Sequence, residues 1–591
     1  MKMFTNKAWN DVNQRLTEKM LQEFMYEDMI RATEVEKEGE VYTFFWDDEN
    51  GRTYQFKGKK RLFDRYTILP GTIKLTGEKV NNSLAITLLS SVHQSLGMNP
   101  TTTGHLIKEY LHTLTADMHL AANQKSNDEL LHMSYEELEG EMTGHPWITY
   151  NKGRIGFSYE DYIKYAPEQK NEVKLHWIAV HKDIASFHAV PPLNHETVVK
   201  GELGINRYEQ FQQLLKERSL ISAEYYLMPV HEWQWKSMIV PLYIEAVAND
   251  QIVMLGEGED YYLPQQSIRT FVNTSHKEKY HVKVPMSILN TLVYRGLPSE
   301  RTIIAPEVTQ FIKGIWEQDA FLREECRVGL LGEVATLNVD QPAFTHIRNV
   351  PYQYLEMLGV VFRESIYTQL EKGEKAITLA ALLHRDVHNE PFVLSLIERS
   401  GLTTEEWIGA LHHAVLPPLL HFLYQYGTVF SPHGQNTVLV LKDHKPVRII
   451  MKDFVDDVNV SDQLLPELER LPQKLKHVLR SEAPEGLTQF ILTGLFICHY
   501  CYLASMLAEE GFSEQSFWAK ARQEILTYQN RFPHLEERFK LFDMLRPTFT
   551  KLCLNRNRMV DYGYNDDHDR PHASEYGVVQ NALNDETLVQ C

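Results

Sequence analysis

The most chemically suggestive stretch of the sequence is residues 431–457, SPHGQNTVLVLKDHKPVRIIMKDFVDD. Two short runs rich in β-branched residues are joined by the turn-forming sequence KDHKP, and this pattern predicts a β-hairpin over residues 437–453. In an antiparallel pair closed around the middle of that turn, Asn436 lies opposite Asp453, and such cross-strand neighbours are about 5 Å apart. An amide oxygen and a carboxylate at this separation suit a hard cation such as magnesium that carries nucleotide phosphates.

Two further polar residues, His433 and Gln435, precede the first predicted strand and would face the same end of the hairpin. Protein kinases hold their metal with a comparable pair, the Asn of the catalytic loop and the Asp of the DFG motif. On this segment alone, an ordinary surface hairpin with solvated polar ends is the leading interpretation. The density of polar side chains at one end of apolar strands is what favours a metal site.

A second group of polar residues lies in the region 173–284, where alternating apolar residues predict a mainly antiparallel sheet. Side chains two residues apart on a strand share a face, so hydroxyl and cationic groups gathered on one face would suit phosphates. A polar face on a half-solvated sheet explains the same pattern equally well. The residues concerned are Ser267, Arg269 and Lys283, with Asn290, Thr291 and Arg295 just beyond.

One loop and one isolated position add three candidates. Residues 141–168 are punctuated by glycine and proline and predict a structured loop, in which Lys152 and Arg154 could address an anionic substrate. Solvated charges are the slightly favoured alternative. Arg363 lies in the apolar segment LGVVFRESI, interpreted as a helix, and a lone buried arginine requires an anionic partner. A carboxylate such as Glu364 or Glu333 would serve, as would a phosphate.

The elements that must position these residues suggest a multi-domain α+β protein. Residues 8–37 and 83–120 have the spacing of amphipathic helices, with a β-hairpin predicted between them. Segments after about residue 307, including 312–328 and 352–370, are interpreted as mostly helical. The predicted domains are a mainly helical domain at 1–170, a β-rich domain at 171–306 and a mainly helical domain at 307–591 that carries the hairpin 437–453.

Composition restricts the class of protein. The chain has 591 residues, 43% of them hydrophobic and 24% charged, which is typical of a folded globular protein. Its net charge of −19 argues against a nucleic-acid partner. Five cysteines and an N-terminus without an apolar core predict a cytoplasmic protein. Residues 486–508 lack charged residues, but polar interruptions favour a buried core helix over a membrane span, with Cys498 and Cys501 as core thiols.

Several segments together resemble one family, the siderophore synthetases that act independently of nonribosomal peptide synthetases, also called IucA/IucC-like synthetases. No P-loop, G-x-G-x-x-G or H-E-x-x-H motif is present, so any phosphate site here is of another kind. The likeness spans residues 145–454 in the family's order. It rests on GHPWITYNKGRIGFSYEDYIKYAPE, PVHEWQW, LPQQSIRT, KVPMSILNTLVYRG, LGE, FRES, SPHGQN and MKDF. One departure is Glu232, where many relatives have proline.

The resemblance implies an ATP-dependent enzyme that forms an amide through an acyl-adenylate. It implies a cupped hand of thumb, fingers and palm, a homodimer, and small carboxylate and polyamine or hydroxamate substrates without nucleic acid or membrane. ATP would be bound by Ser267, Arg269, Thr270, Lys283, Arg363, His433, Gln435, Asn436 and Asp453, and magnesium (Mg²⁺) by Asn436 and Asp453. Substrate would be bound by Lys152, Arg154, Asn290, Thr291 and Arg295, with Arg295, His433 and Lys283 as the catalytic residues.

The subgroup indicated by NKGRIGF, KDFVDDV and the ending LNRNRMVDYGYNDDHDRP acts on amidated carboxylates or on succinyl hydroxamates of diamines. Two other classes remain open on sequence alone. One is a kinase-like phosphotransferase that uses the same hairpin to hold Mg-ATP, and the other is an inactive scaffold.

Overall fold

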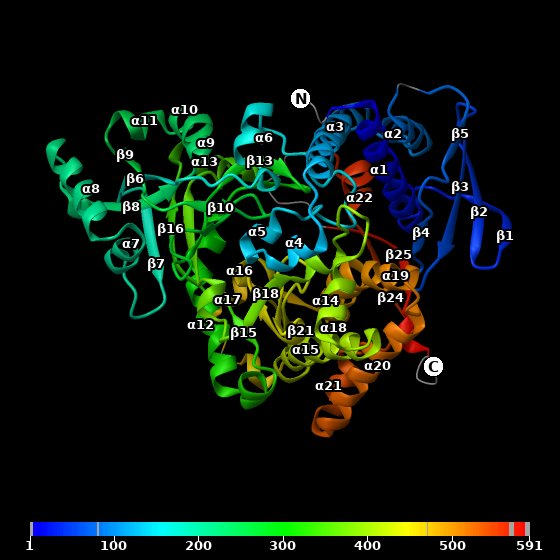
Figure 1. Ribbon diagram of the computed structural model, residues 1–591. Coiled ribbons are helices and arrows are strands. Elements are labelled where there is room, and N and C mark those ends of the chain that lie inside the picture. The colour runs from blue at the N-terminus through cyan, green and yellow to red at the C-terminus, as the bar shows by residue number, and fades with distance from the viewer. Residues whose placement is uncertain (1–3, 80–81, 470, 566–572, 586–591) are drawn as a thin grey trace.

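The computed structural model describes residues 4–79, 82–469, 471–565 and 573–585 (Figure 1). Its N-terminal part combines helices with a five-stranded antiparallel sheet, in which the predicted hairpin is confirmed. The predicted helix 8–37 is confirmed only as far as Tyr26, because residues 33–38 form a strand, and the predicted helix 83–120 is two helices. The helices are α1 (Asn6–Tyr26), α2 (Leu84–Ser95) and α3 (Pro100–Ala122). The strands are β1 (Thr33–Glu38), β2 (Val41–Asp47), β3 (Thr53–Lys60), β4 (Tyr66–Ile68) and β5 (Lys74–Thr76).

The middle of the molecule is built on a six-stranded sheet in the order β10-β11-β12-β17-β16-β7, next to a three-stranded sheet β8-β6-β9. The strands are β6 (His176–His181), β7 (Ala185–Ala189), β8 (Tyr225–Val230), β9 (Ile252–Glu257), β10 (Tyr262–Pro264), β11 (Thr270–Asn273), β12 (His281–Lys283), β16 (Glu333–Val339) and β17 (Gly359–Arg363). A separate pair, β13 (Met286–Asn290) and β14 (Val293–Arg295), follows β12. Helices α7 (His195–Leu203) and α8 (Ile205–Glu217) extend from this part (Figure 1).

This sheet draws strands from both sides of the predicted domain boundary at 306/307. Strand β12 pairs with β17, and β16 pairs with β7, so the two regions share one hydrogen-bonded unit. The domain bounds themselves stay a prediction.

The predicted helix around Arg363 is wrong, because residues 359–363 form strand β17 between β12 and β16. All five residues of β17 are buried. A strand covered on both faces reads as a continuous apolar run, which periodicity alone does not separate from a helix segment. The β-branched pair Val360 and Val361 was the signal for a strand.

The C-terminal part contains a four-stranded sheet in the order β15-β21-β20-β18, covered by helices. Its strands are β15 (Gly329–Leu330), β18 (Glu374–Thr378), β20 (Thr437–Lys442) and β21 (Lys445–Met451). Other elements are α12 (Ser299–Gln318), α14 (Phe392–Ser400), α15 (Thr404–Tyr426), α16 (Phe454–Asp457), α17 (Gln473–Val478), α20 (Glu514–Arg531), α21 (Glu536–Leu541), β24 (Thr548–Cys553) and β25 (Ser574–Gln580).

The predicted hairpin is present as β20 and β21, but its register differs by one residue from the prediction. Thr437 pairs with Met451, which places Asn436 beside Lys452, and the Lys452 N–H donates to the Asn436 carbonyl at 3.3 Å. The difference arises at the turn, where Lys442 pairs with Lys445, so the hairpin closes around Asp443 and His444, earlier than predicted; a β-bulge between Val440 and Leu441 recovers one residue of that shift. Turn sequence alone did not reveal this bulge.

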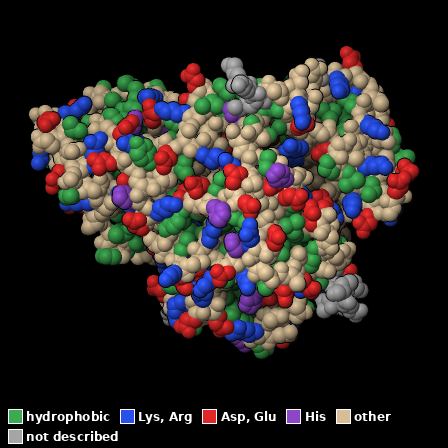
Figure 2. Space-filling model, in the orientation of Figure 1, with side chains coloured by type: hydrophobic (Ala, Val, Ile, Leu, Met, Phe, Trp, Pro, Cys, Tyr) green, Lys and Arg blue, Asp and Glu red, His purple; other side chains and the backbone are tan. Residues whose placement is uncertain are grey.

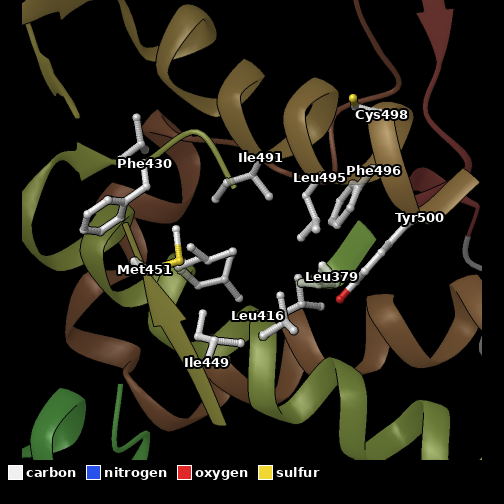
Figure 3. Packing of buried hydrophobic residues seen from close by; sticks show 14 of the residues in the cluster. Leu379, Leu416, Phe430, Ile449, Met451, Ile491, Leu495, Phe496, Cys498 and Tyr500 are labelled. Atoms are coloured by element: carbon white, nitrogen blue, oxygen red, sulfur yellow. The ribbon is translucent and has the colours of Figure 1, made fainter. Parts of the chain in front are cut away.

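The stretch without charged residues, 486–508, lies in a core helix. It runs as α18 (Pro484–Ile491), a π-helical segment (Leu492–Tyr500) and α19 (Cys501–Glu509). It is the one helix in the described ranges long and apolar enough to cross a membrane, and 67% of that window is buried inside the protein. Figure 3 shows Ile491 and Leu495 facing the same core as Ile449 and Met451 of β21.

The two thiols of this helix behave as predicted. Cys498 and Cys501 are buried and unpaired, and burial raises the pKa of the Cys498 thiol to about 12. A thiol that stays protonated at neutral pH is a weak nucleophile and a weak metal ligand. Both are therefore packing residues.

A buried carboxylate joins three segments that lie far apart in the sequence. Glu27, at the end of α1, accepts hydrogen bonds from Trp147 Nε1 at 2.7 Å and from Asn555 Nδ2 at 2.8 Å. It also accepts from the main-chain N–H groups of Asn555 at 3.0 Å and Arg556 at 2.7 Å. This network fixes the loop around Trp147 against the N-terminal helix and the C-terminal part.

We expect Glu27→Ala to lower the free energy of unfolding by about 3 kcal/mol or more, because several buried donors would lose their acceptor. Urea-induced unfolding measures this loss. Glu27→Gln keeps one acceptor oxygen, so its free energy of unfolding should lie between those of Glu27→Ala and the wild type. Glu36→Ala, on the exposed strand β1, is the control and should be as stable as the wild type. A stability of Glu27→Ala equal to that of the wild type would contradict the role of this network.

Candidate functional site

Three cationic side chains project from neighbouring strands of the six-stranded sheet. Thr270 at the start of β11 pairs with Lys283 of β12, and His281 of β12 pairs with Arg363 of β17. Arg269 immediately precedes β11. Arg269, Lys283 and Arg363 are all buried, with 7%, 3% and 2% of their surfaces exposed. Burial of three cations on or beside adjacent interior strands of the sheet requires anionic partners.

The partners are carboxylates that follow the hairpin. Lys283 Nζ lies 2.9 Å from Asp453 Oδ1 and 3.0 Å from Asp456 Oδ2. Arg363 Nη1 lies 3.0 Å from the same Asp453 oxygen, and Arg269 Nη2 lies 3.2 Å from Asp456 Oδ2. The residues after the hairpin and the interior strands β11, β12 and β17 of the large sheet are therefore joined through ion pairs.

These pairs set the charge states of the cluster. Burial alone would raise the pKa of Asp453, but Lys283, Arg363 and Lys452 hold it well below its usual range. Burial likewise opposes the charge on Lys283, yet Asp453 and Asp456 hold its pKa above the usual value. The site thus contains fully ionised groups of both signs in a nearly dry environment, where electrostatic interactions are strong.

A third carboxylate extends the acidic group. The Asn436 amide Nδ2 donates to Asp457 Oδ2, and burial together with the charges of Asp453 and Asp456 raises the pKa of Asp457 well above its usual value. A divalent cation at this position would relieve that repulsion. Sequence reasoning selected Asn436 and Asp453 but missed Asp456 and Asp457, although both stand in the same KDFVDD motif.

The loop before the hairpin carries His433. Burial lowers the pKa of His433 to about 4, so the imidazole is neutral near pH 7, and its Nδ1 accepts the Gln435 N–H at 3.2 Å. The loop is tightly packed at Gly434, whose carbonyl accepts the Ala380 N–H at 2.9 Å. A Cβ at Gly434 would come within 3.0 Å of His499 Cδ2, so the close approach requires glycine.

The segment around Ser267 is a turn, which corrects the predicted extended strand. The Ile268 N–H donates to the Gln265 carbonyl at 2.7 Å, and Ile268 has a positive φ of 64°. A left-handed residue breaks the alternation of side chains, so Ser267 and Arg269 do not share a strand face. Ser267 Oγ is buried and has no hydrogen-bond partner among the described residues.

Arg295 is the last residue of β14, in the β13/β14 pair. Its Nε donates to the Asn290 carbonyl at 2.9 Å and its Nη2 to the Thr291 carbonyl at 3.4 Å. Asn290 Oδ1 is buried and has no partner within the described ranges, and Thr291 Oγ1 donates to the Asn151 carbonyl at 3.2 Å. The three predicted residues of this segment are thus brought together.

Lys152 and Arg154 are not solvated charges, so that alternative is wrong. Lys152 Nζ lies 2.8 Å from Asp117 Oδ1, so this ion pair joins the loop that carries Lys152 to helix α3. Arg154 donates through both terminal nitrogens to Glu168, and both side chains are almost fully buried. Because both terminal nitrogens of its guanidinium group donate to Glu168, Arg154 is a buried ion-pair residue in the structure. Its role in substrate binding stays a prediction.

The residues present fit a metal-bound polyphosphate. Buried cations, the unpartnered Ser267 Oγ and the acidic side chains beside Asn436 offer donors for phosphate oxygens and acceptors for a hard cation. In the described ranges no three His, Cys, Asp or Glu side chains are arranged to hold a metal by themselves. That agrees with magnesium, which is bound through one or two carboxylates together with substrate phosphates and water.

Charge on the surface is mixed. On the face drawn in Figure 2, acidic and basic side chains alternate over most of the molecule, and the concentrated charges are the buried ones just described.

Comparison with known proteins gives a consistent result. Residues 134–384 match the IucA / IucC family, and residues 405–567 match the ferric iron reductase FhuF-like transporter family. The chain is 41% identical over 586 residues to the rhizobactin siderophore biosynthesis protein RhbF of Rhizobium meliloti, covering 98% of this chain and 96% of that one. It is 33% identical to putrebactin synthase of Shewanella, covering 93% and 87%.

Solved structures agree. The petrobactin biosynthesis protein AsbB of Bacillus anthracis superposes with a TM-score of 0.88 at 27% identity, covering 99% of this chain and 97% of that one. The aerobactin synthetase IucC of Klebsiella pneumoniae superposes with a TM-score of 0.86 at 28% identity, covering 98% of both chains.

The ion pairs predict a competition between Asp456 and an anionic ligand for Lys283 and Arg269. We expect Asp456→Asn to bind inorganic tripolyphosphate roughly tenfold more tightly than the wild type in EDTA, because a charge-assisted hydrogen bond is worth about 1.5–3 kcal/mol. Isothermal titration calorimetry measures the difference. Asp443→Asn, in the exposed hairpin turn, should behave as the wild type, and equal affinities for Asp456→Asn and wild type would show that no such competition exists.

Proposed function

The chain belongs to the IucA/IucC family of siderophore synthetases, and from this premise we propose that it joins a carboxylate to an amine in a reaction that consumes Mg-ATP. Relatives named as synthases and ligases of siderophore biosynthesis support a ligase. The carboxylate would attack the α-phosphate to give an acyl-adenylate and pyrophosphate. The amine would then attack the acyl carbon, releasing AMP.

The observation that carries the proposal is the meeting of buried cations with the carboxylates after the hairpin. Arg269, Lys283 and Arg363 converge within 3.2 Å of Asp453 or Asp456 oxygens. A carboxylate and a phosphate oxygen accept the same charge-assisted hydrogen bonds. The cations are therefore already placed where phosphate oxygens could replace carboxylate oxygens.

Adenylation requires mainly the positioning of the reactants and the neutralisation of phosphate charge, and Arg269, Lys283 and Arg363 can supply both. Magnesium, when held by Asn436 and Asp453, would neutralise phosphate charge. Ser267 and Thr270 would donate hydroxyl hydrogen bonds to phosphates, with Gln435 beside them. Arg295 would orient the reacting carboxylate.

His433 suits a role as a hydrogen-bond donor more than as a base. Its pKa of about 4 leaves the imidazole neutral and weakly basic near pH 7. Since Nδ1 accepts the Gln435 N–H, the proton of the neutral ring lies on Nε2, which can donate to a developing negative charge.

The proposed substrates are a citryl or succinyl carboxylate and an amine or N-hydroxylated diamine. The names of relatives, which include putrebactin synthase, aerobactin synthase and a citryl-spermidine ligase, support this class. We further propose a cupped-hand arrangement of thumb, fingers and palm, a cytoplasmic location and a homodimer. The likeness to the petrobactin and aerobactin enzymes supports the arrangement of the hand.

The test is the identity of the released nucleotide. With Mg-ATP, hydroxylamine and a panel of carboxylates (citrate, citryl monoamides and N-hydroxy-N-succinyl-cadaverine), we expect carboxylate-dependent formation of AMP, pyrophosphate and a hydroxamate. Chromatography separates AMP from ADP. Release of ADP would instead identify a kinase-like phosphotransferase, and no turnover with any carboxylate would favour a scaffold.

Two substitutions test the site assignment. We expect Asp453→Ala and Arg295→Ala each to lower kcat/KM by about 100-fold or more, because electrostatic contacts to the reacting groups are worth this much in comparable sites. Circular dichroism should show a folded chain in both. Full activity in either variant would remove that residue from the catalytic site.

A further inference from the structure

The hairpin turn next to Arg295 has a backbone conformation that its own sequence does not favour. Strands β13 and β14 are joined by the two residues Thr291 and Leu292, because Asn290 pairs directly with Val293. Both turn residues have positive φ, 52° and 78°. Two-residue turns with positive φ at both positions normally contain Asn-Gly or Asp-Gly, since bulky and β-branched residues adopt this conformation only at a cost in free energy. Such a conformation persists where the surrounding structure imposes it.

The surrounding structure acts on this turn through Arg558. The Leu292 carbonyl accepts a hydrogen bond from Arg558 Nη2, while Arg558 Nη1 donates to the Gly563 carbonyl at 2.6 Å. Arg558 is 5% exposed and lies in the segment 554–565, LNRNRMVDYGYN, a sequence motif that the phosphate site does not use. One buried guanidinium thus joins the hairpin turn to the C-terminal part of the chain.

Arg558 is itself held in place by contacts with helix α3. The Tyr564 ring centroid lies 4.4 Å from Arg558 Cζ, and the Tyr564 hydroxyl donates to Glu109 of α3. Gly563 has a positive φ of 61°, and a Cβ there would come within 2.6 Å of Thr102 Oγ1 on the same helix. Glycine is therefore required where the motif turns against α3. The guanidinium of Arg558 is fixed between this helix and the hairpin.

The same turn determines where the Arg295 guanidinium lies. Arg295 Nε donates to the Asn290 carbonyl at 2.9 Å, and Nη2 donates to the Thr291 carbonyl at 3.4 Å. The Thr291 carbonyl belongs to the peptide group between Thr291 and Leu292. A change of Leu292 to negative φ would rotate this peptide group and move the acceptor that Arg295 uses. A contact that fixes the turn therefore also fixes Arg295.

We propose that Arg558 is a positioning residue for Arg295. By donating to the Leu292 carbonyl, it holds the Thr291–Leu292 turn at positive φ, and the turn in turn holds the guanidinium that orients the reacting carboxylate. Arg558 acts through the backbone and not through contact with substrate. This inference rests on the proposed function, because the place of Arg295 affects turnover only if Arg295 takes part in the reaction. The competing explanation is that Arg558 only stabilises the C-terminal motif.

The first experiment removes the donors of Arg558. In Arg558→Met we expect kcat/KM for the carboxylate to fall about tenfold or more, because a misplacement of about 1 Å at a reacting group can cost about 100-fold in rate. The KM for Mg-ATP should stay as in the wild type, since Arg269, Lys283 and Arg363 lie on other strands or next to them. Wild-type kcat/KM in Arg558→Met would overturn the proposal.

The matched control is Arg522→Met. Arg522 of α20 is another buried arginine, and its Nη1 donates to the carbonyl of Leu583. Its replacement removes a comparable contact between a guanidinium and the main chain at another place in the C-terminal part. We expect Arg522→Met to lower the free energy of unfolding and to keep the kcat/KM of the wild type. An equal fall in kcat/KM in both variants would support general destabilisation and overturn the proposal.

The second experiment restores the turn without Arg558. Glycine adopts positive φ without steric cost, so Leu292→Gly should restore most of the kcat/KM that Arg558→Met loses. The Leu292 side chain packs against the core of the N-terminal part, so Leu292→Gly also lowers stability. If Arg558 only stabilises the C-terminal motif, the double variant is less stable than Arg558→Met and no more active. Absence of rescue would therefore overturn the proposal.

A third measurement reports the hairpin without turnover. Hydrogen exchange of residues 286–295, followed by mass spectrometry, should be faster in Arg558→Met than in the wild type and slower again in the double variant. If no carboxylate yields AMP with the wild type, the proposed function fails, and unchanged exchange in Arg558→Met would show separately that Arg558 does not hold the turn. If AMP forms but Arg558→Met keeps full activity, the positioning role alone is disproved.

Discussion

The charge on Lys283 is the constraint on which the arrangement of the site depends. This side chain is 3% exposed and reaches carboxylates on two separate elements, Asp453 and Asp456 after the hairpin and, at 3.7 Å, Glu333 of β16. Leaving such a charge without its partners costs about 3–5 kcal/mol. The end of the hairpin is therefore held against the large sheet at one position. Arg269 and Arg363 pair with the same carboxylates that this position provides.

Much of the site could be predicted from the sequence because the relevant residues lie in short recognisable motifs. The hairpin pattern selected Asn436 and Asp453, and the pattern of the predicted sheet together with the resemblance selected Ser267, Arg269 and Lys283. The ion-pair partners of these residues could not be predicted from the sequence. Arg154 and Lys152 looked like solvated charges until their partners Glu168 and Asp117, distant in sequence, were placed beside them. Long-range ion pairs leave no local signal.

The errors concentrate where the backbone departs from regular geometry. Ile268, Thr291, Leu292 and Asp453 all have positive φ, which is rare for residues other than glycine. Each lies in or beside the candidate site, and strained conformations of this kind are commonly retained where function needs them. Patterns of period two or 3.6 cannot predict them. The buried strand β17 was misread for a different reason, since burial on both faces removes its alternation.

The sheet that draws strands from both sides of residue 306 has a consequence for how such proteins can recombine. A chimera made by joining the first 306 residues of this chain to the remainder of a relative would place β12 of one parent against β17 of the other. Side chains of β12 and β17 pack in one hydrophobic core. The residues of the two parents that meet in this core would therefore have to match in size and shape. Exchange of whole halves between relatives at residue 306 is thus restricted by the packing of this shared sheet.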